Sequence, residues 1–346
     1  MALYSIVVFF IISPFLPAIG NAHWFFRTAD FVRLQSLFIQ LILMLLFLYS
    51  EAEYTLFSWI LLAGLLISML YQLIKVMPYS AIYPRRKSDA TSDGSVSILA
   101  GNVLQTNTNY QKFIKEINRF DPDVVLTMES NSDWEQGLSE IEKTYPHSIK
   151  VPLENLYGMH VFSKMKLDNV VVKYQIEDDK PSLFFDFPLE NGHAIFFCCL
   201  HPAPPSPTEN ETAKERDAEL ILTGKTIRKT DKPTVVCGDM NDVVWSRTTR
   251  LFKKMTGMID PRVGRGFFPT YHADYFFLRF PLDHLFHTKD LYVGTMKRSK
   301  NFGSDHFAMY YEIHHKEKKS TPRNPKINGE EREKIENLVE EGKNND

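Results

Sequence analysis

The sequence of 346 residues predicts an α/β protein, in which a sandwich of mixed or antiparallel β-sheets follows a group of N-terminal transmembrane helices. Residues 1 to about 79 are almost continuously Leu, Ile, Phe, Val and Met. From residue 95 onward, short apolar runs alternate with polar segments of helical periodicity. Several of these runs alternate apolar and polar residues, which is typical of antiparallel strands with one face covered. A membrane part is therefore expected to precede a soluble domain.

Three apolar segments in the first quarter of the chain are candidates for spanning a bilayer. They cover residues 2–20, 34–50 and 57–74, each near the roughly 20 residues that a bilayer core requires. The first contains two prolines, so a kinked span and a re-entrant segment are both open for it. A cleaved signal peptide is disfavoured, because no Lys or Arg precedes the first apolar run and further spans follow it. The region 1–80 is predicted to hold two to three transmembrane helices.

The distribution of basic residues predicts the side of the membrane on which the domain lies. Arg27 and Arg33 separate the first two segments, and Lys75 with the basic run 85–87 follows the third. The loop between the second and third segments carries only acidic charges. Because Lys and Arg near span ends are retained in the cytoplasm, three spans place the domain on the cytoplasmic side. Three cysteines, two of them adjacent, also fit a reducing compartment better than a disulfide framework.

The soluble domain is predicted to cover residues 95–315, after a polar, turn-rich linker over 81–94. It opens with a strand over 95–103, a helix over 109–120 with apolar residues at helical spacing, and a strand over 121–130. Strand, helix and strand in this order are the usual opening of an α/β protein.

The rest of the domain is predicted to contain one long helix and several further strands. The helix covers 211–229 and has its acids mostly early and its bases late, as the helix dipole favours. The tail, 316–346, is charged and poor in apolar residues, so it is predicted to be disordered apart from a short helix over 330–341. The further strands are expected over 156–164, 167–176, 182–189, 193–201, 233–241, 282–288 and 306–314.

Polar residues stand at the ends of the predicted strands, where they would share one rim of the sheets. Each alone has an ordinary explanation, since an Asn after Gly is commonly a turn residue and an Asp after a strand commonly caps the next segment. Together they supply two amides, four acids and two imidazoles, a set suited to a site on a rigid scaffold. The set is Asn102, Glu129, His201, Asp239, Asn241, Asp283, Asp305 and His306.

These residue types fit metal-assisted attack of water on a phosphate ester. A hard divalent cation such as Mg²⁺ prefers carboxylate oxygens, which Glu129 and Asp305 would supply. An Asp and an imidazole can orient and deprotonate the water, while amides and a second imidazole can donate hydrogen bonds to the phosphate. No spacing of Cys and His predicts structural zinc. Glycosidase chemistry would use two carboxylates but would leave both His and both Asn without a role.

Short motifs surround these residues in a fixed order: "GNVLQTN", "TMES", "YGMHVFSK", "HPAPP", "GDMNDVVWS", "LDHLF" and "GSDHFAMYYEI". This ordered set resembles the endonuclease/exonuclease/phosphatase superfamily, also called DNase I-like, over nearly all of residues 95–313. It looks most similar to a bacterial branch in which membrane spans precede the domain. The resemblance implies a four-layer αββα sandwich, two sheets packed face to face between helices, and hydrolysis that depends on Mg²⁺ or Mn²⁺.

The resemblance also implies which residues hold the metal. Glu129 corresponds to the principal metal ligand, and Asn102 lies beside it. Asp305 corresponds to a further ligand or to an acid just behind the ligands. No cofactor other than the divalent cation is implied.

The catalytic residues implied by the resemblance are the remaining five. Asp239 orients or activates the nucleophilic water, and Asn241 contacts the phosphate. His306 is the imidazole at the scissile phosphate and is oriented by Asp283. His201 is a second imidazole that faces the phosphate or the leaving group.

The expected function is that of a membrane-anchored, divalent-metal-dependent phosphoesterase that hydrolyses a phosphodiester or a phosphomonoester. Anchoring favours a substrate at the membrane surface, such as a lipid headgroup, and the bacterial branch favours the inner membrane with the domain in the cytoplasm. A nuclease that acts on nucleic acid and a catalytically silent interaction module are the alternatives. No obligate protein partner is expected beyond the lipid bilayer itself.

Two basic stretches are expected near the site. "RTTRLFKK" follows the Asp239 loop, and "MKRSK" precedes the Asp305 loop. A solvated helix face explains the first stretch equally well, whereas Lys297, Arg298 and Lys300 in the second favour an anionic substrate. A nuclease is expected to carry a broader basic surface for the phosphate backbone, but the chain has a formal net charge of −2.

Overall fold

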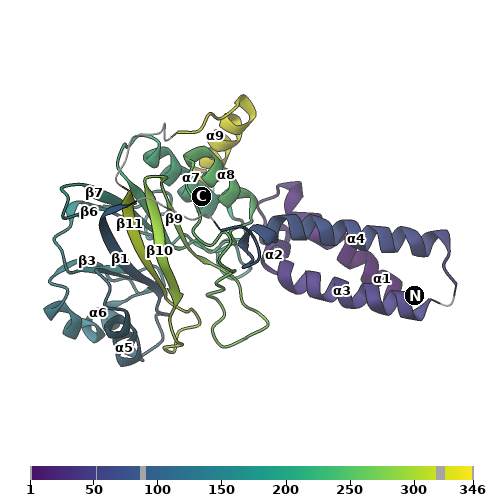
Figure 1. Cartoon of the computed structure of the whole chain (residues 1–346), viewed down its shortest axis with the longest axis horizontal. Helices are drawn as coiled ribbons and strands as arrows, with labels where there is room; N and C mark the ends of the chain where they lie inside the picture. Colours follow the sequence, from purple (N-terminus) through teal and green to yellow (C-terminus); the bar gives the residue numbers. More distant parts are fainter. Residues whose placement is uncertain (1, 52, 86–90, 317–323, 345–346) are drawn as a thin grey trace.

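The computed structural model describes residues 2–51, 53–85, 91–316 and 324–344. Figure 1 shows two parts, a β-sandwich flanked by helices and a bundle of helices that projects from it. The sandwich is built from two mixed sheets, as the sequence predicts.

The first sheet has six strands in the order β10-β11-β1-β2-β4-β3. The neighbours β1 and β2 are parallel, and the other neighbouring pairs are antiparallel. Two of its strands, β3 and β10, were not expected from the sequence. The bounds are β1 Ser92–Asn102, β2 Val124–Met128, β3 His147–Val151, β4 Met159–Ser163, β10 Leu291–Arg298 and β11 Met309–Lys316.

The second sheet has five strands in the order β5-β6-β7-β8-β9. Here β7 and β8 are parallel, and the other neighbouring pairs are antiparallel. All five strands were expected from the sequence. The bounds are β5 Asp168–Lys173, β6 Ser182–Pro188, β7 Ala194–Leu200, β8 Thr234–Asp239 and β9 Asp283–His287.

The core lies between the two sheets, and helices cover their outer faces. Fully buried residues such as Ile98 of the first sheet and Phe197 of the second fill the space between them. The outer face of the first sheet packs against α5 (Tyr110–Phe120), α6 (Ser132–Gly137) and the short 3-10 helix η3 (Ser139–Lys143). The outer face of the second sheet packs against α7 (Lys214–Ile227) and α8 (Arg247–Thr256). The expected four-layer αββα sandwich is therefore confirmed.

The direction of the strands brings their polar ends to one rim. The parallel strands β1 and β2 end at the same edge, and so do β7 and β8. Because β11 runs antiparallel to β1 and β9 antiparallel to β8, both begin at that edge. Residues that follow the first four strands and precede the other two therefore gather at one place.

The projecting bundle contains two helices that are long and apolar enough to cross a membrane, α3 and the segment Leu56–Tyr79. The first apolar segment is shorter and passes from an α-helix into a 3-10 helix that contains two prolines. Some polar side chains inside the bundle pair with one another, since Gln40 Nε2 donates to Ser68 Oγ at 2.9 Å and Gln72 Nε2 to Gln40 Oε1 at 2.6 Å. The bounds are α1 Ala2–Ile12, η1 Ser13–Ile19, α2 Trp24–Phe31, α3 Arg33–Ser50, α4 Leu56–Val76 and η2 Met77–Tyr79.

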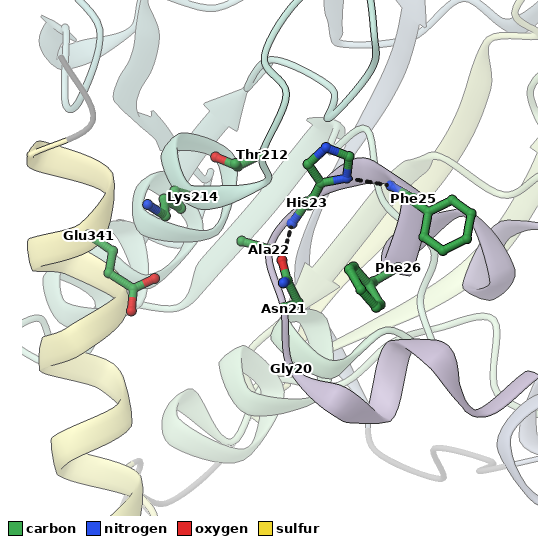
Figure 2. Close-up of a pocket in the computed structure, with 9 residues that line it drawn as sticks. All are labelled: Gly20, Asn21, Ala22, His23, Phe25, Phe26, Thr212, Lys214 and Glu341. Atoms are coloured by element: carbon green, nitrogen blue, oxygen red, sulfur yellow. Dashed lines mark hydrogen bonds between the residues drawn. The ribbon is translucent and has the colours of Figure 1, made fainter.

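The bundle is docked firmly on the sandwich through α2 and the segment before it. Arg27 forms a buried ion pair of 2.8 Å with Asp217 of α7, and Trp245 Nε1 donates to Asp30 O at 2.8 Å. Trp24 N also donates to Glu211 O at 2.9 Å. Figure 2 shows the chain from Gly20 to Phe26 running beside the start of α7, next to an open pocket. The bundle and the sandwich also share an apolar cluster, in which Tyr79 of the bundle packs with Trp245 of the sandwich, and the sequence did not predict this contact.

The C-terminal tail differs from the expectation of disorder in the residues that the structure describes. The helix α9 (Gly329–Lys343) is longer than the expected helix over 330–341, and it packs against α7. Its buried Ile335 and Val339 join Ile221 and Leu251 in one apolar cluster. Two apolar residues spaced four apart suffice for this contact, because they lie on the same face of the helix. Residues 317–323 of the tail lie outside the described part.

The predicted linker over 81–94 ends earlier in the structure than in the prediction. The strand β1 starts at Ser92 rather than at residue 95, because its pairing with β11 extends to Lys316 across an irregular register. Residues 86–90 of the linker lie outside the described part.

We predict that Gly238→Ala destabilises the fold strongly. Gly238 of β8 has φ +138°, and a Cβ there would lie 2.0 Å from the Leu200 carbonyl oxygen of β7. We expect a loss of about 3 kcal/mol or more, since backbone cannot move aside in a packed sheet. Thermal unfolding of the full chain in detergent measures the effect. Gly192→Ala is the matched control, because φ there is also positive at +81° but nothing lies within 4 Å. Equal losses in both variants would contradict the packing argument.

Candidate functional site

A cavity of about 330 Å³ opens at the rim where the strand ends meet. All eight residues predicted for the site lie in it or directly behind it. Six of them line the cavity: Glu129, His201, Asp239, Asn241, Asp305 and His306. The other two, Asn102 and Asp283, are almost fully buried and make hydrogen bonds to residues of the first group. The topology thus brings together residues that are as far as 204 positions apart, which is 306 minus 102.

Glu129 is a buried carboxylate at the end of β2. Burial raises its pKa to about 7, although a hydrogen bond from Asn102 opposes this shift. Asn102 Nδ2 donates to Glu129 Oε1 at 2.7 Å and lies 3.2 Å from Asp239 Oδ2, so one amide links the two acids. The Asn102 Oδ1 atom accepts from Leu104 N at 3.0 Å, which fixes the orientation of that amide. Glu129 has φ +58°, a left-handed conformation that turns its side chain into the cavity.

His306 is held between two carboxylates. Its Nδ1 is 2.8 Å from Asp283 Oδ2, and its Nε2 is 3.5 Å from Asp239 Oδ2. Burial alone would lower the pKa of the imidazole, but the charges of Asp283 and Asp239 raise it to about 10. His306 is therefore an imidazolium at neutral pH, and it places a positive charge at the base of the cavity.

Asp239 and Asn241 are fixed by the backbone of the loop after β8. Asp239 Oδ1 accepts a hydrogen bond from Asn241 N at 3.0 Å. Asn241 adopts φ +47°, and its Nδ2 donates to Pro202 O at 3.0 Å. This contact ties the loop after β8 to the loop after β7, which carries His201.

His201 is the second imidazole of the cavity, and its pKa is shifted in the opposite direction from that of His306. It is only 3% exposed, and burial lowers its pKa to about 4, so the ring is neutral at neutral pH. The ring of Tyr157 lies against it, with 5.1 Å between the ring centroids. Nδ1 of His201 has no hydrogen-bond partner among the described residues.

The segment "GSDH" connects two neighbouring strands of the first sheet. Ser304 Oγ donates to Asn102 O at 2.9 Å and accepts from His306 N at 3.0 Å, which joins the end of β1 to the start of β11. Gly303 has φ +103°, and this conformation turns the chain so that both Asp305 and His306 face the cavity.

Comparison with known proteins identifies the scaffold. The model of the endonuclease/exonuclease/phosphatase family matches residues 99–306, more than half of the chain. The chain belongs to the endonuclease/exonuclease/phosphatase family. The superfamily resemblance seen in the sequence is thereby confirmed, and family members are hydrolases that act on phosphate esters. No curated protein matches the sequence.

Solved structures of this family share the fold at low sequence identity. A humanized D. rerio TDP2 is 16% identical, with 63% of this chain and 98% of that chain covered and a TM-score of 0.53. The human Nocturnin catalytic domain with bound sulfate is 14% identical, covers 65% and 96%, and has a TM-score of 0.53. A family member from Bacteroides vulgatus is 16% identical, covers 64% and 99%, and has a TM-score of 0.53. These similarities concern the sandwich and support the fold alone.

Sequence reasoning missed several residues of the site in this family member. Tyr271 lines the cavity with its ring 5.0 Å from that of His306, and Phe31 reaches the cavity from α2. Tyr271 directly follows the segment "GRGFFPT", whose two glycines and proline mark a loop and were a usable signal. Phe31 had no such signal, because it lies in the region predicted to belong to the membrane.

The acidic cavity could hold a divalent cation. Asp239, Asp283 and His306 bring their ligand atoms within 4.8 Å of one another. However, Asp283 Oδ2 is hydrogen-bonded to His306 Nδ1 and is therefore not free to bind a metal. The buried carboxylate of Glu129, with the acids of Asp239 and Asp305 facing the same cavity, is the better match to the oxygen ligands of a hard cation.

The basic stretches do not reach the cavity, contrary to the expectation from sequence. None of the described residues lining it is Lys or Arg. Arg298 donates to Pro269 O at 2.7 Å and stacks on Phe307, so it supports the domain. In the other stretch, which forms α8, Lys253 Nζ donates to Tyr79 OH at 2.5 Å and Lys254 pairs with Glu331. The α8 stretch thus holds the bundle and α9 to the domain.

We predict that Thr270 is needed to hold Asp283 in place. Its buried Oγ1 accepts hydrogen bonds from Asp283 N at 3.2 Å and Leu282 N at 3.3 Å. Thr270→Val keeps the shape but removes the acceptor, which should cost about 1–3 kcal/mol. Thr270→Ser keeps the acceptor and is the control. Thermal unfolding of the two variants in detergent measures the difference, and a Val variant as stable as the Ser variant would contradict this role.

Proposed function

We propose that the protein is a membrane-anchored hydrolase that uses a divalent cation to cleave a phosphodiester or a phosphomonoester. The observation that carries this proposal is the cavity in which three acids, Glu129, Asp239 and Asp305, face a charged His306. Family membership supports hydrolysis of a phosphate ester, and the acidic cavity supports the cation.

The residues fit a divalent cation such as Mg²⁺, or Mn²⁺ in its place. Burial raises the pKa of Glu129 to about 7, so the ionised carboxylate lacks sufficient compensation from the protein alone. We assign Glu129 and Asp305 as ligands, with Asn102 orienting Glu129 from behind. When bound, the cation would polarise the phosphate and offset the negative charge that develops in the transition state.

Asp239 is proposed as the base that activates water. Its Oδ2 lies beside the Nε2 atom of His306, at the point where Asn102 also contacts it. As the water oxygen forms its bond to phosphorus, Asp239 accepts the proton that the water loses. The bond from phosphorus to the ester oxygen breaks, and that oxygen leaves with the electron pair and takes up a proton from solvent.

The imidazoles and Asn241 are proposed to bind the phosphate. His306 carries a positive charge, held by Asp283, and donates from Nε2 toward a nonbridging oxygen. His201 is neutral because of its burial and donates to the phosphate or the leaving group through its protonated nitrogen. Asn241 also lines the cavity, and we assign it a contact to the phosphate.

We further propose that α3 and α4 anchor the enzyme in a bacterial inner membrane, with the domain in the cytoplasm. Both candidate spans meet the length and apolarity that a bilayer requires. Arg27, Arg33 and Lys75 lie near the ends of the spans that face the domain, as the positive-inside rule favours for a cytoplasmic domain.

Nucleic acid is the second candidate substrate. A solved structure with the same fold, that of D. rerio TDP2, is complexed with a single-strand DNA product. The absence of Lys and Arg among the described lining residues favours a smaller ester over a polyanion. A catalytically silent interaction module is disfavoured, since the residues proposed for the reaction lie in one cavity or directly behind it.

We predict that the full chain in detergent hydrolyses a chromogenic phosphodiester when Mg²⁺ is present, that EDTA abolishes this activity, and that added Mg²⁺ restores it. Asp239→Asn and His306→Gln should each lower the rate by about 10²–10⁴-fold, because the first removes the base that accepts the proton of water and the second removes the charged donor of a hydrogen bond to the phosphate. Initial rates on bis(p-nitrophenyl) phosphate and p-nitrophenyl phosphate measure both effects, with plasmid DNA and RNA as further substrates.

The control for this experiment is Glu190→Gln, the same loss of a carboxylate at an exposed position in the turn after β6. It should leave the rate unchanged. Silence of the wild-type enzyme on every substrate, or equal rates for wild type and site variants, would refute the proposed hydrolysis and favour the interaction module.

A further inference from the structure

The loop between Tyr271 and Phe280 carries four consecutive exposed apolar residues at its tip. Tyr275 is 60% exposed, Phe276 72%, Phe277 80% and Leu278 52%. We call residues 275–278 the aromatic tip. Contiguous large apolar side chains in water mark a contact surface, because soluble proteins rarely expose them together.

The aromatic tip is held outward by its own hairpin. Tyr271 N donates to Phe280 O at 3.0 Å, and His272 N donates to Leu278 O at 3.1 Å. The Arg279 guanidinium lies 5.3 Å from the ring centre of Phe276 and donates to Ala273 O at 2.7 Å. These contacts keep the apolar side chains from folding back onto the sandwich.

The tip lies at the end of a candidate membrane span. Gln35 Nε2, in the first turn of α3, donates to Phe277 O at 2.8 Å. Figure 1 shows α3 beginning beside the sandwich and running away from it. Its 18 residues give a length of about 27 Å at 1.5 Å per residue, close to the thickness of a hydrocarbon core. If α3 crosses a bilayer, the tip lies at the level where the headgroups begin.

Aromatic residues also lie on α2, the helix before α3. One residue, Val32, separates α2 from α3, and Phe25 of α2 is 53% exposed beside Trp24. Trp, Tyr and Phe are favoured at the boundary between headgroups and hydrocarbon. The exposed apolar surface of the span continues outward from this point, with Phe38 63% exposed and Leu45 57% exposed.

The base of the same hairpin forms the wall of the site. Tyr271 and Phe280 both line the cavity, together with Phe31 of α2. On this side, the cavity is bounded by α2 and by the hairpin whose tip contacts the first turn of α3. A water-soluble substrate would not require this placement.

We infer that the aromatic tip enters the headgroup region of the bilayer that holds α3 and α4, and that the cavity accepts a phosphate ester carried by a lipid of that bilayer. This inference rests on the proposed function for both the anchor and the hydrolysis. A protein partner could cover an apolar tip elsewhere on the surface. Here the tip continues the apolar surface of a span, and this continuity identifies the bilayer as its occupant.

The test places an environment-sensitive fluorophore on single introduced cysteines in the full chain, reconstituted in nanodiscs of phosphatidylcholine and phosphatidylglycerol. The three native cysteines are fully buried, so the label reacts with the introduced one. Phe277→Cys reports on the tip. Val171→Cys is the control, an apolar position 45% exposed on the edge strand β5. Leu66→Cys, 51% exposed in the middle of α4, reports on the span.

Quenching by a nitroxide high on the lipid chain and by aqueous iodide separates the outcomes. We expect severalfold stronger lipid quenching at position 277 than at position 171, and strong lipid quenching at position 66. Quenching at position 277 by iodide alone, with position 66 still quenched by lipid, overturns the inference and leaves the anchor intact. A label at position 277 shielded from both quenchers also overturns it, because a protein surface then covers the tip. If position 66 is not quenched by lipid, the anchor itself fails and the inference falls with it.

A rate measurement tests the substrate class. The double variant Phe276→Ser/Phe277→Ser should lose about tenfold or more of its rate on a fluorogenic phosphodiester lipid in the nanodisc, since burial of each ring is lost. Its rate on soluble bis(p-nitrophenyl) phosphate should stay at the wild-type value, because neither residue lines the cavity. Equal losses on both substrates, or no loss on the lipid, would overturn a lipid-borne substrate. Inactivity of the wild type on both would instead refute the proposed hydrolysis.

Discussion

The concentration of acidic groups at one rim is the constraint on which this structure depends. Glu129, Asp239, Asp283 and Asp305 meet there, and two of them hold His306 as an imidazolium. One imidazolium does not balance the charge of four carboxylates, and burial of Glu129 raises its pKa to about 7. A divalent cation bound here would balance these charges and would supply the electrophile that hydrolysis of a phosphate ester requires. The group of four carboxylates is therefore the source both of the electrostatic cost of the site and of its proposed chemistry.

The strand topology of the sandwich brings the acidic residues of this cluster together. Parallel pairs in the centre of each sheet end at the same edge, and their antiparallel neighbours begin there, so residues distant in sequence become neighbours. The bundle adds to this scaffold, because α2 packs on Trp245 and contributes Phe31 to the cavity. Truncation before the sandwich would therefore uncover apolar core and remove part of the site. The helical bundle and the sandwich are best understood as one structural unit.

Much of the site could be predicted from the sequence, because strand ends and motifs identify polar residues locally. Glu129 and Asp239 follow clear apolar strands, and "GSDH" contains its own turn residue. Other features depend on long-range packing. The strand β10 includes Gly294 and an irregular register, so its pattern is weak, and Phe31 lies in a segment that reads as membrane. The sequence does not show which way the Arg298 side chain points, because this depends on stacking of its guanidinium on the ring of Phe307. The sequence of α9 is mostly charged, so the packing of its buried Ile335 and Val339 against the domain was not predicted.

The most direct test of the central claim is a titration of the full chain with Mn²⁺. Binding is measured as a decrease of the free-ion signal in electron paramagnetic resonance. The account predicts a bound Mn²⁺ that competes with Mg²⁺, and affinity about 10–100-fold weaker in Glu129→Gln if that carboxylate is a ligand. Glu190→Gln should bind as wild type does. Binding of equal strength in Glu129→Gln and wild type, or no binding in either, would contradict the claim that the acidic cavity holds a catalytic cation.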